Sequence, residues 1–144
     1  MAKINASRVL LGGLLAGIVI NLFEFVSNAV IFKDDIAAAM AALNKTMDMS
    51  GGTMAIYVCW AFLIGIVAVW LYAAIRPRFG AGLVTAVKTG LVMWVLVAVQ
   101  TTISFAPMGL FPRRLMAIGL VISLVELVLA TVLGAWLYKE EAAT

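Results

Sequence analysis

Four long apolar stretches dominate the sequence and restrict the folds open to it. A hydrocarbon core of about 30 Å requires about 20 apolar residues per helix. Stretches of this kind occupy residues 8–32, 54–75, 81–105 and 115–138. The chain is 65% hydrophobic and 12% charged, whereas soluble domains average about 45–50% and about 25%. We therefore expect an all-α membrane protein whose residues 1–144 form a single domain of four transmembrane helices.

The connections between these stretches predict how the helices are arranged. Residues 76–80 and 107–114 form short connections rich in Arg, Pro and Gly, so consecutive helices should be antiparallel neighbours in an up-down four-helix bundle. The first stretch is too long for the apolar region of a signal peptide and is expected to be an uncleaved span. Between the first two stretches, Ile36, Met40, Leu43 and Met47 recur at helical spacing, which predicts a short amphipathic helix over residues 35–49 at the membrane interface.

Lysine and arginine predict the orientation, because these residues are enriched in cytoplasmic connections. One side of the membrane would hold Lys3, Arg8, Arg76, Arg78 and Lys139, with Lys88 added if it reaches the headgroups. The other side would hold Lys33, Lys45, Arg113 and Arg114. The difference favours a multi-pass protein of the inner (plasma) membrane with both termini in the cytoplasm.

Two acidic residues lie inside the apolar stretches. Glu24 shares one side of the first stretch with Asn21 and Asn28, within about 80° on a helix. Glu126 shares a side of the fourth stretch with Ser123. A charged group at the bilayer centre costs roughly 2.5–3.5 kcal/mol on insertion scales, so such groups usually face other helices or a wet cavity. At 1.5 Å per residue, Glu24 and Glu126 lie at similar depths, roughly 24 Å and 18 Å from their cytoplasmic ends.

If these polar faces meet, the two carboxyl groups share one site of low dielectric constant. Desolvation and mutual repulsion would then favour a bound proton near neutral pH. The expected polar intramembrane site consists of Asn21, Glu24, Asn28, Lys88, Gln100, Ser123 and Glu126. Such a site would bind and release a proton or a cationic solute. Two alternatives remain open: the carboxyl groups are hydrogen-bonded contacts between helices, or Lys88 forms a salt bridge with Glu126 instead of extending to the headgroups.

Small residues also recur on one face of each apolar stretch. Small side chains let helix backbones approach closely, and van der Waals packing then holds membrane helices together. The expected helix-packing positions are Gly13, Gly17, Gly65, Gly82, Gly119 and Gly134. If these faces point outward instead, they are docking surfaces for a second copy of the chain or for other membrane subunits.

The sequence lacks the patterns of catalysis and metal binding. It contains no histidine, which is the commonest metal ligand and general base. Its single Cys59 cannot form an internal disulfide. Phosphate-binding glycine loops, zinc spacings, nucleophile elbows and haem attachment motifs are also absent. We therefore expect no enzymatic activity, no cofactor and no metal. The net charge of +3 fits anionic lipid headgroups better than nucleic acid, because no basic patch is interleaved with aromatics.

The acidic interruption at Glu24, Trp94 in the third stretch, and the turn from Pro107 to Arg114 before a glycine-rich fourth stretch resemble small bacterial four-helix integral membrane proteins of uncharacterised function. The resemblance implies a membrane-spanning four-helix fold. In size, and in having a carboxylate in the first span, the chain is also similar to the small multidrug exporters, which work as dimers. The residues around Glu24 do not reproduce the local motif of that family, which also lacks a segment like residues 35–49.

Three functional hypotheses follow. In the first, Glu24 and Glu126 handle protons, cations or a small solute in a transport bundle. In the second, the protein is a non-catalytic structural or assembly subunit of a membrane complex. The third is a lipid-binding or sensing role for residues 34–49. Carboxyl groups that share one water-reachable cavity would favour transport, and small faces left open on the outside would favour a partner subunit.

Overall fold

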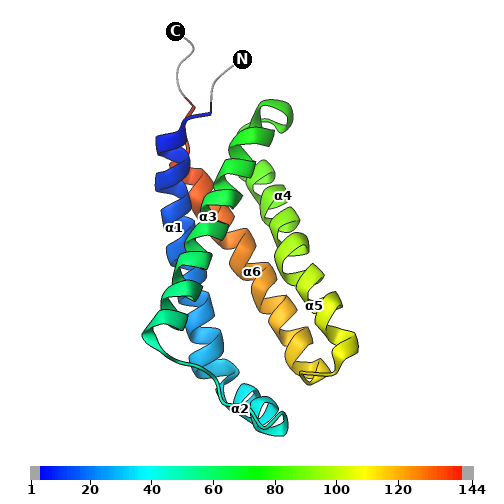
Figure 1. Cartoon of the computed structure of the whole chain (residues 1–144). Coiled ribbons are helices and arrows are strands. Elements are labelled where there is room, and N and C mark those ends of the chain that lie inside the picture. Colours follow the sequence, from blue (N-terminus) through cyan, green and yellow to red (C-terminus); the bar gives the residue numbers. More distant parts are fainter. Residues whose placement is uncertain (1–3, 141–144) are drawn as a thin grey trace.

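The computed structural model describes residues 4–140, and within this range every regular element is a helix (Figure 1). Four helical segments are long and apolar enough to span a membrane: Ala6–Ile31, Gly51–Phe79, Leu83–Met108 and Arg113–Leu137. This confirms the expected all-α fold with four candidate membrane spans. Lys3, which entered the orientation argument, lies outside the described residues.

Two of the four spans contain π-helical turns. The first joins α1 (Ala6–Val26) to η1 (Ser27–Ile31). The third consists of α4 (Leu83–Trp94), η2 (Val95–Val99), α5 (Gln100–Phe105) and the 3₁₀ turn η3 (Ala106–Met108). By contrast, α3 (Gly51–Phe79) and α6 (Arg113–Leu137) are continuous. Short π-helical turns inside α-helices are rare and occur frequently at functional sites.

The second span extends beyond its expected end at residue 75. Pro77 lies in the last turn of α3, which continues to Phe79. Proline removes one backbone donor, and near the end of a helix this loss affects few of the hydrogen bonds that follow. Arg76 and Arg78 in the last turn interact favourably with the negative end of the helix dipole. The helix stops at Gly80, whose φ of 85° lies in the region that favours glycine.

The connection between the first two spans contains a shorter helix than expected. The helix α2 covers Lys33–Ala42 rather than residues 35–49. It ends because Asn44 takes a left-handed φ of 52°. The N–H groups of Asn44 and Lys45 then donate to the carbonyl oxygens of Ala41 and Met40, both at 3.0 Å, which closes the helix in the manner of a Schellman motif. Met47 therefore lies in the irregular segment that leads to α3.

The chain runs along the molecule four times. Figure 1 shows that it passes from one end to the other along α1, returns along α3, runs back along α4 and α5, and returns along α6. Helix α1 packs most closely on α3 and α6, and α4 packs on α6. In contrast, α5 has its main contacts with the adjoining turns η2 and η3.

The half of the molecule that carries the chain ends is closely packed. We call residues 4–20, 61–93 and 126–140 the packed half. A Cβ atom added to Gly65 would lie 2.5 Å from both the carbonyl oxygen of Gly13 and the backbone nitrogen of Gly17. Helices α1 and α3 therefore meet backbone to backbone, as small residues permit. At the outer end of this half, the Asn5 N–H donates to the Tyr138 hydroxyl at 3.3 Å.

Aromatic and charged side chains also join the elements at this end. The rings of Tyr72 and Tyr138 meet edge to face, with centroids 6.1 Å apart. The Arg76 guanidinium lies 5.5 Å from the centroid of the Tyr138 ring, and its Nε is 3.7 Å from Glu140 Oε1. The Gly82 N–H donates to the Tyr72 hydroxyl at 3.1 Å. The ends of α1, α3 and α6 and the start of α4 are thus tied together.

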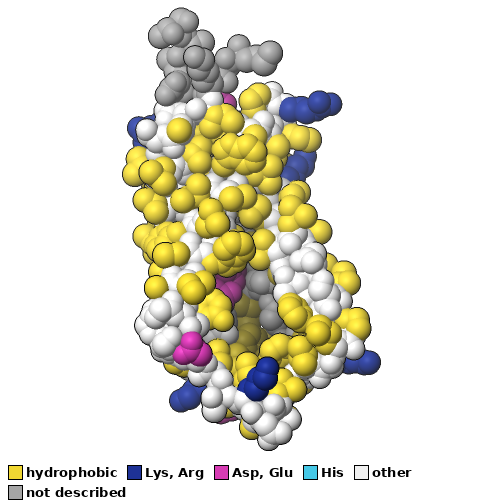
Figure 2. All heavy atoms as spheres, viewed as in Figure 1, with side chains coloured by type: hydrophobic (Ala, Val, Ile, Leu, Met, Phe, Trp, Pro, Cys, Tyr) yellow, Lys and Arg dark blue, Asp and Glu magenta, His cyan; other side chains and the backbone are white. Residues whose placement is uncertain are grey.

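The other half of the molecule is open. We call residues 21–60 and 94–125 the open half. Only Ser27, Phe32, Ala39 and Leu115 are buried in it. Residues 54–60 of α3 are exposed throughout, and η2, α5 and η3 contain no buried residue. Figure 2 shows a hollow in this half, between the α1–α3 side and the α4–α5 side, with acidic side-chain atoms at its inner end.

Candidate functional site

Glu126 lies in α6 where the packed half meets the open half, and its side chain is only 4% exposed. None of the described residues donates a hydrogen bond to its carboxyl group. The one ion pair among the described residues joins Arg76 to Glu140 instead. An ionisable group within a candidate membrane span is costly to bury and is by default a functional candidate. Glu126 is therefore the residue on which the site depends.

Glu24 lies on α1 one turn before the π-helical turn η1 and is exposed. The Asn28 side-chain amide donates to Glu24 Oε2 and to the Glu24 carbonyl oxygen, both at 2.8 Å. The candidate site thus comprises two carboxyl groups on the mutually packed helices α1 and α6, one buried and one hydrogen-bonded to a neighbouring amide.

The packing of α1 on α6 determines the relative depths of these two residues. A Cβ atom added to Gly134 would lie 2.7 Å from the carbonyl oxygen of Gly12, so the two helices are in backbone contact at that level. The helices run in opposite directions (Figure 1). At 1.5 Å per residue, Glu24 lies about 18 Å from the contact along α1, and Glu126 about 12 Å from it along α6. Both displacements lead toward the open half, so the two carboxyl groups arrive at neighbouring depths.

Two more of the expected site residues lie near this pair but bond elsewhere. The Asn21 side-chain amide donates to the carbonyl oxygens of Gly17, at 2.9 Å, and of Val58, at 3.4 Å. Asn21 therefore links α1 to α3. The Ser123 hydroxyl donates to the Leu120 carbonyl oxygen at 3.0 Å. Ser123 is one turn from Glu126 on α6, and its hydroxyl oxygen retains the capacity to accept a hydrogen bond.

Gln100 and Lys88 lie away from the carboxyl groups. The Gln100 amide donates to Ser104 Oγ at 3.1 Å within α5, and both residues are exposed. The Lys88 ammonium lies 5.1 Å from the centre of the Phe79 ring, at the end of α3. Among the described residues, Lys88 forms no salt bridge with Glu126. Both Lys88 and Phe79 are exposed.

The glycines expected at packing positions fall into two groups. Gly13, Gly17, Gly65 and Gly134 lie against neighbouring helices, where an added Cβ atom would clash. Gly82 precedes α4 with a φ of 125°, and Gly119 has no atom within 4 Å of an added Cβ, so neither lies in a close contact. Gly90 also lies in a close contact, although it was not among the predicted packing positions: an added Cβ there would lie 2.7 Å from the Val128 Cα. Small-residue spacing within the third stretch was the signal that could have found it.

Within residues 4–140, no three His, Cys, Asp or Glu side chains lie close enough to hold a metal ion. The arrangement is therefore a pair of carboxyl groups flanked by amide and hydroxyl groups. Its chemistry is the binding of protons or cations, since carboxylates accept hydrogen bonds and protonated carboxyls donate them.

Comparison with known protein families, curated proteins and solved structures finds no match for this chain. The fold and the site together define an all-helical protein with four candidate membrane spans and a pair of carboxyl groups between two of them.

Proposed function

We propose that this protein is a multi-pass protein of the inner membrane that binds and releases a proton or a small cation at Glu24 and Glu126. The observation that carries this proposal is Glu126, which is 4% exposed and accepts no hydrogen bond from the described residues. An ionisable group within a membrane span is expensive to bury and is by default a functional candidate. Glu24, at a neighbouring depth on α1, supplies the second carboxyl group.

The contrast between the two halves of the molecule supports access from one side. The packed half is closed by backbone contacts such as that of Gly65 with Gly13 and Gly17. The open half contains the hollow (Figure 2). In this proposal, water enters the hollow and reaches the carboxyl pair from the side opposite the chain ends. A transport cycle would require a second arrangement of the helices that opens the packed half.

The proposed placement in the membrane follows the distribution of basic residues. The four spans form an up-down bundle with both chain ends in the cytoplasm, because Arg8, Arg76, Arg78 and Lys139 would then lie on the cytoplasmic side. Helix α2 would lie along the opposite interface. Ile36, Ala39 and Met40, which are its less exposed residues, would face the apolar side.

Flux measurements on the purified protein test this proposal. The protein is reconstituted into liposomes that contain a trapped pH indicator, and proton flux is driven by a potassium diffusion potential. Glu126→Gln keeps the shape of the side chain and removes its charge, so we expect flux to fall about tenfold or more. Glu24→Gln should lower flux as well. The matched control Asp35→Asn changes an exposed carboxylate at the start of α2 and should leave flux unchanged.

Two results of these flux measurements would contradict the proposal, and a folding control is required. Wild-type liposomes with no flux above that of empty liposomes, for protons and for small cations alike, would exclude transport. Wild-type flux in Glu126→Gln would exclude the carboxyl pair as its site. Circular dichroism and gel filtration in detergent must show that each variant remains folded, so that a loss of flux reports on the carboxyl group.

A second candidate function is a structural or assembly subunit of a membrane complex. The observation that favours it is the lack of packing around α5, which contains no buried residue and has its main contacts with η2 and η3. A second copy of the chain or another subunit could cover this surface. Light scattering after purification in mild detergent would reveal a dimer or a stoichiometric partner, and a monomer would count against this function. Cys59 is exposed on α3. Crosslinking through this thiol would therefore detect a dimer that forms through α3.

A further inference from the structure

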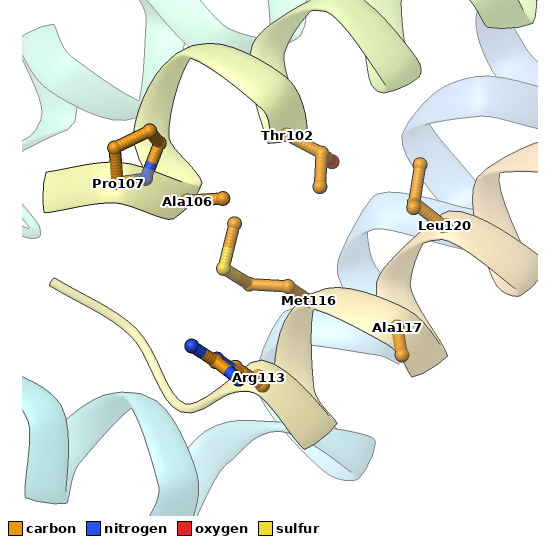
Figure 3. A pocket seen from close by; sticks show the side chains of 7 residues that line it. All are labelled: Thr102, Ala106, Pro107, Arg113, Met116, Ala117 and Leu120. Carbon is orange, nitrogen blue, oxygen red and sulfur yellow. The ribbon is translucent and has the colours of Figure 1, made fainter. Parts of the chain in front are cut away.

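A cavity of about 470 Å³ separates the end of the third span from the beginning of the fourth (Figure 3). One wall consists of Thr102, Ala106 and Pro107, and the facing wall of Met116, Ala117 and Leu120. Figure 3 shows the Met116 side chain extending across the cavity toward Ala106. Arg113, the first residue of α6, completes the lining. This cavity is distinct from the carboxyl pair, and none of its lining residues belongs to that site.

The cavity exists because α5 diverges from α6. The Trp94 indole N–H donates to the Leu120 carbonyl oxygen at 3.0 Å and holds the end of α4 against α6. The π-helical turn η2 follows Trp94 directly, and no residue from η2 to η3 is buried. The chain returns to α6 only after Gly109, which has a left-handed φ of 64°. The two spans are thus joined at both ends of the cavity and separated between them.

The lining of the cavity is amphipathic. Apolar side chains form nearly all of it, and Thr102 contributes one hydroxyl group. Arg113 is its single charged residue, and this guanidinium has no ion-pair partner among the described residues. Leu120 lies seven residues further along α6, about 10 Å from Arg113 at 1.5 Å per residue. An apolar slot with one cationic group at the end of a membrane span suits a molecule with an anionic head and an apolar chain.

We propose that this cavity is a binding site for one anionic phospholipid of the surrounding bilayer. The phosphate group would pair with Arg113, because a guanidinium binds phosphate through two parallel hydrogen bonds. An acyl chain would lie between α5 and α6, against Met116, Ala117 and Leu120. A free phosphate ion fits less well, because the apolar walls offer it no second charged group. The lipid would hold α5 beside α6 where this chain provides few contacts of its own.

Lipid retention by the full chain tests this proposal. The protein is reconstituted into vesicles of equal parts phosphatidylglycerol and phosphatidylcholine, extracted into mild detergent and analysed by native mass spectrometry. We expect the wild type to retain one phosphatidylglycerol molecule in preference to phosphatidylcholine. Arg113→Gln should lower this retention about tenfold, as expected for the loss of a charge-assisted hydrogen bond. Arg114→Gln removes the same charge from the adjacent residue, which does not line the cavity, and should retain the lipid.

Equal losses in Arg113→Gln and Arg114→Gln would overturn the proposal, because general attraction between basic residues and anionic lipid would then be sufficient. Equal retention of the two lipids by the wild type would overturn it as well. Displacement of the lipid by millimolar inorganic phosphate would show a free-anion site instead.

A second variant tests the apolar part of the cavity without changing its charge. Ala117→Phe fills the slot and keeps Arg113, so retention of phosphatidylglycerol should fall while gel filtration still shows a folded protein. Wild-type retention in Ala117→Phe would place the bound lipid elsewhere on the molecule and overturn the assignment.

Discussion

Gly65 sets the distance between α1 and α3. An added Cβ atom there would lie 2.5 Å from the backbone of Gly13 and of Gly17. These are backbone atoms, which cannot move aside by changing a rotamer, so the helices themselves would have to separate. We expect Gly65→Ala to destabilise the fold by about 1–3 kcal/mol through overpacking. Thermal unfolding in detergent, followed by circular dichroism, measures the effect.

Gly119 provides the matched control, because an added Cβ atom there has no neighbour within 4 Å. It also lies inside a long helix that is apolar enough to span a membrane. Gly119→Ala should leave stability unchanged or raise it by up to about 1 kcal/mol, since alanine has the higher helix propensity. Equal destabilisation by Gly65→Ala and Gly119→Ala would show that the close approach at Gly65 does not limit stability.

The two glutamates in the candidate membrane spans show what the sequence reveals at the scale of single residues. In the sequence, the apolar surroundings of Glu24 and Glu126 identify both as candidate site residues and do not distinguish between them. In the structure, Glu126 is buried without a hydrogen-bond partner among the described residues, whereas Glu24 is exposed and accepts a hydrogen bond from Asn28. Helical periodicity shows which residues share a face, but not which neighbouring helix covers that face. The contacts of the Asn21 and Lys88 side chains are likewise visible only in the packed structure.

At the scale of elements, the beginning of α3 depends on a group of side chains outside the membrane span. Ser50 is the N-cap, and its hydroxyl oxygen accepts a hydrogen bond from the Thr53 N–H at 3.4 Å. The Asp48 carboxylate accepts hydrogen bonds from the Thr53 hydroxyl, from the Ser50 N–H at 2.9 Å and from the Ser50 hydroxyl at 3.1 Å. These hydrogen bonds hold the pKa of Asp48 below its usual value, and the hydrogen bond from the Thr53 side chain has the largest effect.

The lowered pKa predicts how the first turn of α3 responds to pH. A carboxyl group whose pKa is lower in the folded state contributes stability that is complete above its unfolded pKa, about 3.9 for aspartate, and is lost as pH falls through the folded value. The amide protection factor of Thr53, measured by hydrogen exchange, should therefore be constant from neutral pH to about pH 5 and fall below about pH 4. Asp48→Asn should remove this dependence. The same fall in Asp48→Asn would show that another group titrates there.

Element boundaries show a different limit of sequence analysis. Apolar length was sufficient to place four candidate spans, because a helix must satisfy its own backbone hydrogen bonds in hydrocarbon. It did not reveal η1 or η2. The hydrogen bond from Trp94 to the Leu120 carbonyl oxygen lies immediately before η2. The Asn28 side chain, in η1, forms hydrogen bonds back to Glu24 in α1. Sequence periodicity likewise overestimated α2, since Asn44 ends that helix through a local backbone conformation.

At the scale of the whole molecule, the first and last described residues lie on the same side. The Asn5 N–H donates to the Tyr138 hydroxyl at 3.3 Å, which joins the beginning of the first span to the end of the fourth. We therefore expect a reporter fused at either end to give the same result. A fluorescent protein that folds only in the cytoplasm should be fluorescent at both ends, and one inserted beside Gly109, at the opposite end of the molecule, should not.

Opposite results at the two chain ends would contradict the four-span arrangement. Fluorescence at the Gly109 insertion alone would instead reverse the orientation assigned from the basic residues. The distribution of lysine and arginine predicts only which side of the membrane each chain end occupies. A reversed orientation would therefore leave the predicted fold unchanged.

The order of residues along the chain is enough to establish that this protein is all helical, that four of its segments are long and apolar enough to span a membrane, and that two carboxyl groups lie inside them. These conclusions follow from local properties, because helix length and hydrophobicity are summed along the chain. The packing of the helices was needed to establish that Glu126 is the buried member of the pair and that α5 diverges from α6 around a cavity. Burial and separation depend on which helix faces meet, and contacts such as that of Gly12 with Gly134 join residues far apart in the chain.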